Sequence, residues 1–498
     1  MIGRRRRDGG DPASTGPQAS TGPQVGVLSP PGGTAVPTRR GSELALLAFA
    51  AVLTTSALAL VEANQEQALS LDVLTYGLAF LGLYAVTHVA VRRLAPHADP
   101  LILPCVAVLN GLGLVLIHRL DLAEAAQALQ AGEAVPSGDA PNQVVWTAIG
   151  VLLFVAVLAV VRDHRLMARY GYTLGLVGLV ALAIPAVLPA SLSEVNGAKI
   201  WIRLPGLSIQ PGEFAKILLL IFVAAFLVAK RDLFTTAGRH VLGLDLPRAR
   251  DLGPLIVAWG LSVLVLVFEQ DLGTSLLLFG TVLAMIYVAT ERASWLVIGL
   301  SLFAVGAWTA YQLFARVQIR VSTWLDPFAD YDDTGYQLSQ ALFGLGTGGV
   351  GGTGLGAGRP ETVPFAKTDF ITSTIGEELG LIGLAAVLML YSLITLRGMR
   401  SAIAVRDSFG KLLASGLAFA MALQVFVVVG GATDLIPLTG LTLPFLSYGG
   451  SSLVANYALV AILLRISDAA RRPAPTRGPT PVPQAPIADA PTQMVQRP

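Results

Sequence analysis

Twelve long apolar runs dominate the sequence and decide what the chain can fold into. Each is close to the roughly 20 residues that an α-helix needs to span a bilayer. They lie at about 43–62, 73–91, 100–117, 144–161, 171–190, 213–229, 253–268, 274–290, 295–314, 376–396, 409–432 and 445–465. Composition agrees, because 54% of the residues are hydrophobic and only 13% are charged, against roughly 25% charged in soluble proteins. We predict an all-α polytopic membrane protein with about twelve spans.

The span count depends on one tight connection. Only EQDLG separates the runs at 253–268 and 274–290, so ten or eleven spans remain open. The polar tails, 1–41 and 468–498, are rich in arginine or proline and bury too little apolar area to fold, so we predict that both are disordered. The net charge of +2 gives no reason to expect nucleic acid. The single cysteine excludes an intramolecular disulfide.

The distribution of lysine and arginine indicates the orientation. Basic loops, such as 162–169 and 397–411, alternate with loops that lack these residues, such as 63–72 and 433–444. The positive-inside rule places both termini in the cytoplasm. It leaves 191–212 and 315–375 outside, the latter as a large loop before the tenth span. These outer segments still hold basic residues, which suggests an anionic ligand: Lys199, Arg203, Arg316, Arg320, Arg359 and Lys367.

The segment Asn196–Lys216 allows two interpretations. Glu213 and Lys216 are one helical turn apart and are expected to pair. As a simple interfacial anchor, Trp201 would lie in the aromatic belt and Lys216 would extend toward the membrane surface. As a binding site, Arg203 and Lys216 would hold a phosphate while Glu213 keeps Lys216 in place.

Acidic residues lie in two connections. Asp271 follows a short turn and is expected to cap the helix that begins near Thr274; a role in the site is the alternative. An acidic, aromatic stretch at 324–337 contains carboxylates that have the chemistry to bind a divalent cation through oxygen, although a solvated loop is the simpler interpretation. These carboxylates are Asp326, Asp330, Asp332 and Asp333.

The segment Val363–Gly380 carries the strongest candidate for chemistry. Asp369 opens a helical run, but Thr368 already supplies a capping side chain. A carboxylate at the outer membrane surface is suited to act as a general base on a hydroxyl. Glu377 and Glu378 do not share a face with Asp369; they are expected either to add polarity at the membrane interface or to pair with a neighbouring helix. The glycine-dense stretch 344–358 lacks the βαβ context of a nucleotide loop, so we predict a flexible loop. Ser451 and its polar neighbours pack helices or line a cavity.

Five motifs together resemble the SEDS family of RodA, FtsW and SpoVE. They are GAKIWIRLPGLSIQPGEFAK, QDLGTS, DPFADYDDTGYQLSQALFGLGTGGVGGTGLG, TDFITSTIGEELG and PLTGLTLPFLSYGGSSL, in family order within residues 100–467. The family has ten spans in a transmembrane helix bundle. The resemblance therefore implies two additional N-terminal helices in 42–98 and a glycosyltransferase core in 99–467 containing the loop 315–375. The longer actinobacterial RodA branch has this organisation.

The resemblance implies a peptidoglycan glycosyltransferase in the bacterial cytoplasmic membrane. It would polymerise lipid II into β-1,4 glycan strands on the outer face, with inversion, for elongation and cell shape. The family's catalytic aspartate corresponds to Asp369. The residues expected to bind substrate or its diphosphate are Lys216, Glu213, Arg203, Lys199, Trp201, Asp271, Lys367 and Ser451. Mg²⁺ or Mn²⁺ is a candidate cofactor, and a class B penicillin-binding protein, a transpeptidase, is the implied partner.

This chain departs from the family pattern at four positions: Ile200 replaces an arginine before the tryptophan, Gly212 replaces a serine or alanine, Gln270 replaces a proline, and Lys367 replaces a histidine. Lys199 or Arg203 would then take the phosphate contact of the missing arginine. Three other functions remain open: a lipid II flippase, an FtsW-like division polymerase and a non-catalytic scaffold. A flippase requires polar groups along the whole bundle, whereas the motifs here concentrate on the predicted outer side.

Overall fold

The structure is a computed structural model. It describes residues 38–65, 69–195, 198–204, 207–230, 239–241, 244–246 and 260–473, with single-residue gaps at 262, 266, 268 and 270. Most of both predicted tails and most of the predicted span at 253–268 lie outside the described residues. The ends of the tails that are described, 40–41 and 468–471, are helical, which the predicted disorder did not anticipate. The described residues belong to one compact unit.

The described chain is almost entirely helical, which confirms the predicted class. Ten of the described helices are long and apolar enough to cross a membrane. They are α1 (Arg40–Gln65), α2 (Leu71–Leu94), α3 (Ile102–Ala131), α4 (Ala140–Val160), α8 (Pro211–Ala229), α11 (Leu272–Thr290), α12 (Ala293–Leu313), α15 (Ile371–Ala404), α16 (Ser408–Ala432) and α17 (Gly450–Arg471). A shorter apolar helix, α6 (Gly171–Val187), coincides with another predicted span. The total of twelve remains a prediction, because the run at 253–268 is largely undescribed.

Short elements connect these helices. They are the helices α5 (Arg165–Arg169), α7 (Ala190–Ser193), α13 (Ala315–Leu325) and α14 (Tyr336–Gly348), and the 3₁₀ turn η1 (Pro360–Thr362). Three antiparallel two-stranded hairpins pair β1 (Glu194–Val195) with β2 (Ala198–Lys199), β3 (Ile202–Leu204) with β4 (Leu207–Ile209), and β5 (Arg239–Val241) with β6 (Leu244–Leu246). The predicted outer loop 315–375 therefore contains two helices and the start of a third.

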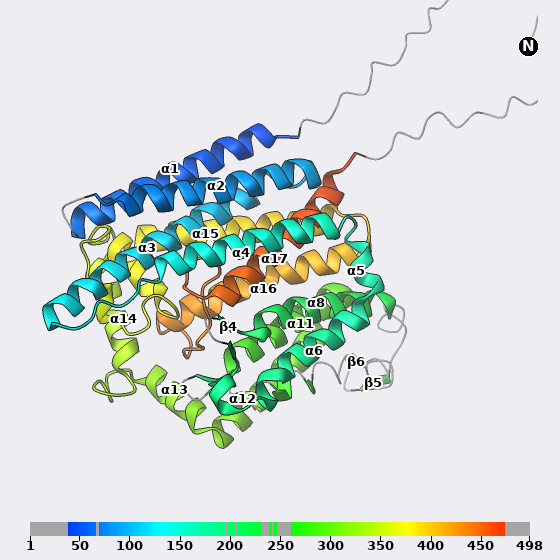
Figure 1. Ribbon diagram of the computed structural model, residues 1–498. Coiled ribbons are helices and arrows are strands. Elements are labelled where there is room, and N and C mark those ends of the chain that lie inside the picture. The colour runs from blue at the N-terminus through cyan, green and yellow to red at the C-terminus, as the bar shows by residue number, and fades with distance from the viewer. Residues whose placement is uncertain are drawn as a thin grey trace, which may run out of the picture. The chain divides into compact units, whose positions relative to one another are not determined.

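The long helices pack side by side around a continuous apolar core (Figure 1). α3 and α17 are buried along most of their length, and α17 packs on α4, α15 on α16, and α6 on α8. α1 and α2 pack on each other and against α3 and α4. α12 packs only lightly, on α11 and α13, and leaves most of its apolar surface exposed. Such a surface is expected of a helix that faces lipid.

Several charged side chains inside the bundle have charged or hydrogen-bonding partners, which offsets the cost of their burial. Arg119 of α3 is fully buried and contacts Glu378 of α15 through Nε. Its other nitrogens donate to Glu361 Oε2 at 2.6 Å and to the Gly358 carbonyl at 2.5 Å. Glu377 accepts from the Arg359 backbone N–H at 2.6 Å. The prediction that Glu378 pairs with a neighbouring helix is confirmed, and these pairs fix the start of α15 to the loop before it.

Glycine allows that loop to pack against α15. A Cβ on Gly348 would collide with the backbone of Gly376 and Glu377. Gly380 interrupts α15 with φ of 68°, a conformation that favours glycine. Its backbone lies against Val350 and Gly352. The glycine-dense stretch, predicted as a flexible loop, is therefore helical up to Gly348 and then follows the α15 backbone closely.

Candidate functional site

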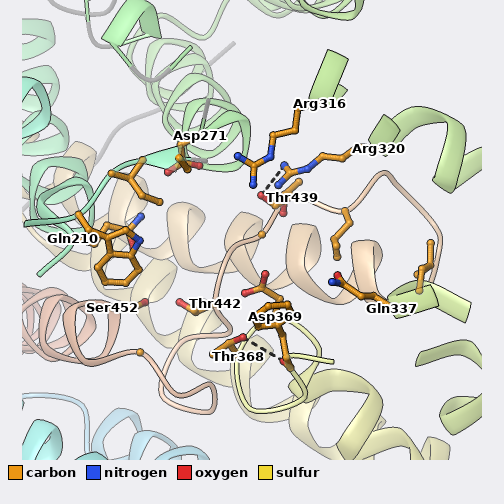
Figure 2. A pocket seen from close by; sticks show the side chains of 18 of the residues that line it. Gln210, Asp271, Arg316, Arg320, Gln337, Thr368, Asp369, Thr439, Thr442 and Ser452 are labelled. Carbon is orange, nitrogen blue, oxygen red and sulfur yellow. Dashed lines mark hydrogen bonds between the residues drawn. The ribbon is translucent and has the colours of Figure 1, made fainter. Parts of the chain in front are cut away.

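A cavity of about 660 Å³ lies at the end of the bundle that carries these loops (Figure 2). Its walls come from segments far apart in the sequence: residues 198–201 and Gln210, the start of α11, α13, the start of α14, the segment 365–369, and the connection from α16 into α17. Most of the polar side chains that line it belong to the predicted motifs. The cavity is therefore the place where the separate motifs meet.

Asp369 lines this cavity from the segment between η1 and α15. Phe365 begins a tight turn there with φ of 58°, and its carbonyl accepts from the N–H groups of Thr368 at 3.0 Å and Phe370 at 3.3 Å. Positive φ is unusual for a bulky residue, so surrounding contacts must hold the turn. One contact is the Ser447 hydroxyl, which donates to the Thr368 carbonyl at 2.6 Å. α15 begins only at Ile371, and its N-cap residue Phe370 makes no side-chain cap, so Asp369 does not cap this helix.

The surroundings of Asp369 tune its acidity. Burial raises the pKa of this carboxyl to about 6, and the negative charge of Asp271 adds to the rise. The positive charge of Arg320 and a hydrogen bond with Thr368 act in the opposite direction. The group is then ionised at neutral pH but holds a proton more readily than an ordinary aspartate. A pKa close to the working pH is what a general base needs.

Two arginines of α13 face the same space, one helical turn apart. Figure 2 shows Arg316 and Arg320 side by side, extending toward Thr439 and Asp369. Arg320 donates to the Thr439 carbonyl at 3.2 Å. Burial lowers the pKa of Arg320, as does the like charge of Arg316, while Asp271 and Asp369 raise it. The sequence identifies both arginines only as basic residues on the predicted outer side, and the predicted site does not include them. Their i, i+4 spacing, which places both on one face of a helix, is the sequence signal that could have identified them.

Asp271 has a structural role and also lines the cavity. Its carboxylate caps α11 by accepting from the Thr274 N–H at 3.0 Å, so the predicted cap is confirmed. Burial raises the pKa of Asp271, the hydrogen bond from Thr274 opposes this, and Glu213 adds to the rise. Trp201 and Ser451, both in the predicted site, also line the cavity, and Ser451 Oγ accepts from the Gln210 N–H at 2.9 Å.

Lys216 and Glu213 form the predicted ion pair, with Nζ and Oε2 2.5 Å apart, and both are buried. Neither lines the cavity. Lys216 also donates to Gln424 at 3.0 Å, and Gln424 donates to the carbonyl of Thr442, a cavity residue, at 2.8 Å. The pair therefore supports the cavity wall from behind.

The other predicted basic residues do not reach the cavity lining. Lys199 in β2 is half-buried and Arg203 in β3 is exposed. Lys367, two residues before Asp369, extends to the other side of its segment. There Nζ lies 2.7 Å from Asp121, 2.6 Å from Glu124 and 3.0 Å from Asp139. Burial acts to lower the pKa of Lys367, but hydrogen bonds with these carboxylates outweigh it and raise that pKa.

The acidic stretch offers no ready metal centre. Asp326 accepts from the N–H groups of Phe328 and Ala329, and Asp330 accepts from Thr334, so both stabilise their own turn. Among the residues that the structure describes, no three histidine, cysteine or carboxylate side chains are grouped to hold an ion. The expected Mg²⁺ or Mn²⁺ therefore stays a prediction, and no step below depends on it.

The fold and the cavity define an all-helical, multi-span membrane protein in which two carboxylates and two arginines line a cavity at one end of the bundle. The chain belongs to the FtsW, RodA and SpoVE family, whose model FTSW_RODA_SPOVE, "Cell cycle protein", matches residues 100–472. Helices α1 and α2 precede the matched residues.

Known relatives are similar over nearly the whole chain. Peptidoglycan glycosyltransferase RodA of Mycobacterium tuberculosis is 60% identical, covering 93% of this chain and 97% of the relative. Its counterpart from Mycobacterium leprae is 57% identical, covering 95% and 98%. A chain from a solved structure described as "Structural coordination of polymerization and crosslinking by a peptidoglycan synthase complex" is 27% identical. Its TM-score is 0.58, and the match covers 76% of this chain and 99% of that one.

Proposed function

We propose that the protein is a peptidoglycan glycosyltransferase that polymerises lipid II into β-1,4 glycan strands at the outer face of the membrane. The observation that carries the proposal is the cavity in which Asp369 faces the arginines of α13. The extensive identity to relatives named peptidoglycan glycosyltransferase RodA supports the same activity.

Asp369 is the proposed general base. It would take the proton from the 4-hydroxyl of the acceptor's N-acetylglucosamine while that oxygen attacks the anomeric carbon of the donor sugar. The bond from that carbon to the polyprenyl diphosphate breaks, and the diphosphate leaves with the electron pair. A single displacement inverts the α-linked donor to a β-linked product. The pKa of about 6 keeps the carboxylate ionised before the reaction and able to accept the proton during it.

Arg316 and Arg320 are the proposed partners of the leaving diphosphate. Fixed cations facing a position where negative charge develops stabilise the transition state, and a site shielded from water strengthens the effect. Planar guanidinium groups also suit the paired oxygens of a phosphate. Lys216, predicted as a direct contact, would act indirectly through Gln424 and Thr442.

Orientation and partnership complete the proposal. Both termini would lie in the cytoplasm, which puts the cavity end outside. Similarity to the named RodA proteins favours elongation over division. A class B penicillin-binding protein is the proposed partner, supported by the likeness to a chain of a peptidoglycan synthase complex. That partner would crosslink the strands made here.

The test is lipid II polymerisation by the full-length protein together with its transpeptidase, comparing wild type with Asp369→Asn. We expect strands from wild type and none from the variant, which is nearly isosteric and should remain folded. Asp72→Asn is the matched control, since Asp72 is an exposed carboxylate in α2 outside the cavity. Equal activity of Asp369→Asn would remove Asp369 as the base. No product from wild type, where a known polymerase works, would favour a flippase or a scaffold.

A further inference from the structure

Lys367 is unusual because its ammonium group makes its ion pairs on the side of the segment that faces away from the cavity of Asp369. Its ammonium group is held by three carboxylates, and only 11% of its side chain is exposed. Asp121 and Glu124 belong to α3, and Asp139 immediately precedes α4. Asp121 also accepts from the Ala140 N–H at 2.7 Å. One lysine therefore ties the segment carrying Asp369 to the connection between two long helices.

The same segment is held on its other side by the connection before α17. The Tyr448 N–H donates to the Lys367 carbonyl at 2.7 Å, and Ser447 donates to the Thr368 carbonyl. The Tyr448 side chain also makes a hydrogen bond with Asp139. Lys367 thus lies at the centre of a network that joins three parts of the chain.

The segment is also a thin wall between two cavities. A second cavity of about 350 Å³ is lined by Glu124, Asp139, Glu361 and Lys367. Phe365, Thr368 and Tyr448 line both cavities. The wall is one segment thick and contains a strained turn at Phe365. Its buried side chains, Val363, Ala366 and Phe370, pack in one apolar cluster with Leu120 and Leu338. The position of the wall depends on the groups that hold it from each side.

We propose that Lys367, together with Asp121, Glu124 and Asp139, is a positioning clamp that holds Asp369 in the cavity. This proposal rests on the glycosyltransferase activity proposed above and goes beyond it. Lys367 would act on the reaction through the backbone of Thr368 and Asp369 and would not touch the substrate. The three carboxylates outnumber the one ammonium group, so the clamp presents no free cation to a diphosphate.

The clamp predicts a specific split in the kinetics of Lys367→Met. Displacing a catalytic group by about 1 Å costs up to about 100-fold in rate, so we expect kcat to fall by about 10- to 100-fold. The KM for lipid II should change by less than about twofold, because the lysine binds no substrate. Lys367→Arg keeps the charge and the donors and should recover most of the lost rate. Lys411→Met is the matched control, since Lys411 is exposed in the first turn of α16 and lines neither cavity.

Hydrogen–deuterium exchange of full-length wild type and Lys367→Met provides a second readout that needs no activity. We expect faster exchange across residues 363–370 in Lys367→Met and an unchanged pattern in Lys411→Met. Asp121→Asn should add little to the effect of Lys367→Met, because both changes remove the same contact.

The outcomes separate the two proposals. Wild-type kcat in Lys367→Met, or unchanged exchange at 363–370, would overturn the clamp. A large rise in KM at unchanged exchange would also overturn it, in favour of direct substrate binding. If wild type and Lys367→Met both fail to polymerise where a known polymerase works, the proposed function fails, and the exchange data still decide whether the clamp exists.

Discussion

Replacing Arg320 with methionine should change how the activity depends on pH. The charged groups around Asp369 are Arg320 and, behind it, Arg316 on α13, and Asp271 at the start of α11. Arg320 is the cation that opposes the upward effect of burial on the pKa of Asp369. Methionine has a similar length but no charge, so that pKa should rise further. Asp369 acts as a base only when ionised, and a higher pKa moves the acidic limb of the rate profile to higher pH.

The size of the shift follows from the geometry at Gly440. Arg320 Nη2 and Asp369 Oδ2 lie 3.4 Å and 3.7 Å from the point that a Cβ on Gly440 would occupy. The two atoms are therefore at most about 7 Å apart, and unit charges at that distance in a medium of effective dielectric about 20 interact by roughly 2 kcal/mol. One pKa unit corresponds to about 1.4 kcal/mol. Both groups are partly exposed, which reduces the interaction, so we expect a shift of about one pH unit.

The assay is the rate of glycan formation at saturating lipid II, from about pH 5 to pH 9, a range that brackets the pKa of about 6. Arg320→Met should also lower the plateau by about 100-fold if the guanidinium stabilises the leaving group. Arg320→Lys keeps the positive charge and is the control, so its acidic limb should stay near the wild-type pH. A limb at the wild-type pH in Arg320→Met, or one displaced to lower pH, would refute the electrostatic link between Arg320 and Asp369.

Three further outcomes are expected. Arg119→Met leaves Glu378 as an unpaired buried charge and should destabilise the protein by about 3–5 kcal/mol; thermal unfolding should show partial recovery in the double variant with Glu378→Gln. Asp271→Ala should lose about 1 kcal/mol of stability with the α11 cap, whereas Asp271→Asn keeps a good capping residue; equal unfolding midpoints for the two would contradict the capping role. The divalent cation stays a prediction: polymerisation should stop in excess chelator and return with Mg²⁺ or Mn²⁺, and unchanged activity in chelator would remove it.

Hydropathy was sufficient to predict the helices because the bilayer imposes their length and composition. Eleven of the predicted runs coincide with described helices. The boundaries were less predictable where helices leave the apolar region. α3 continues to Ala131 through a stretch rich in alanine, leucine and glutamine, residues that favour helix without being apolar throughout. α15 begins at Ile371, earlier than its apolar run, and the polar side chains of this first turn, Thr372, Ser373 and Thr374, are buried inside the bundle.

The site was only partly predictable, because a sequence does not say to which side of its segment a side chain extends. Asp369, Asp271, Trp201 and Ser451 line the cavity as the motifs suggested. Lys367 lies only two residues from Asp369, yet its partners come from the connection between α3 and α4. Arg316 and Arg320 reach the cavity because the loop that carries them folds as α13 and presents both on one face.

The C-terminal end of α1 also bears on how the protein can be shortened. Asn64 donates to the Leu355 carbonyl at 2.6 Å and Gln65 to the Gly356 carbonyl at 2.8 Å. These carbonyls belong to the glycine-rich connection whose Gly356 N–H donates to Glu378. A truncated protein limited to the family region, 100–472, would expose these carbonyls together with the apolar faces of α3 and α4. Laboratory versions for purification or inhibitor screening should therefore begin no later than Thr38, so that the first two helices are retained.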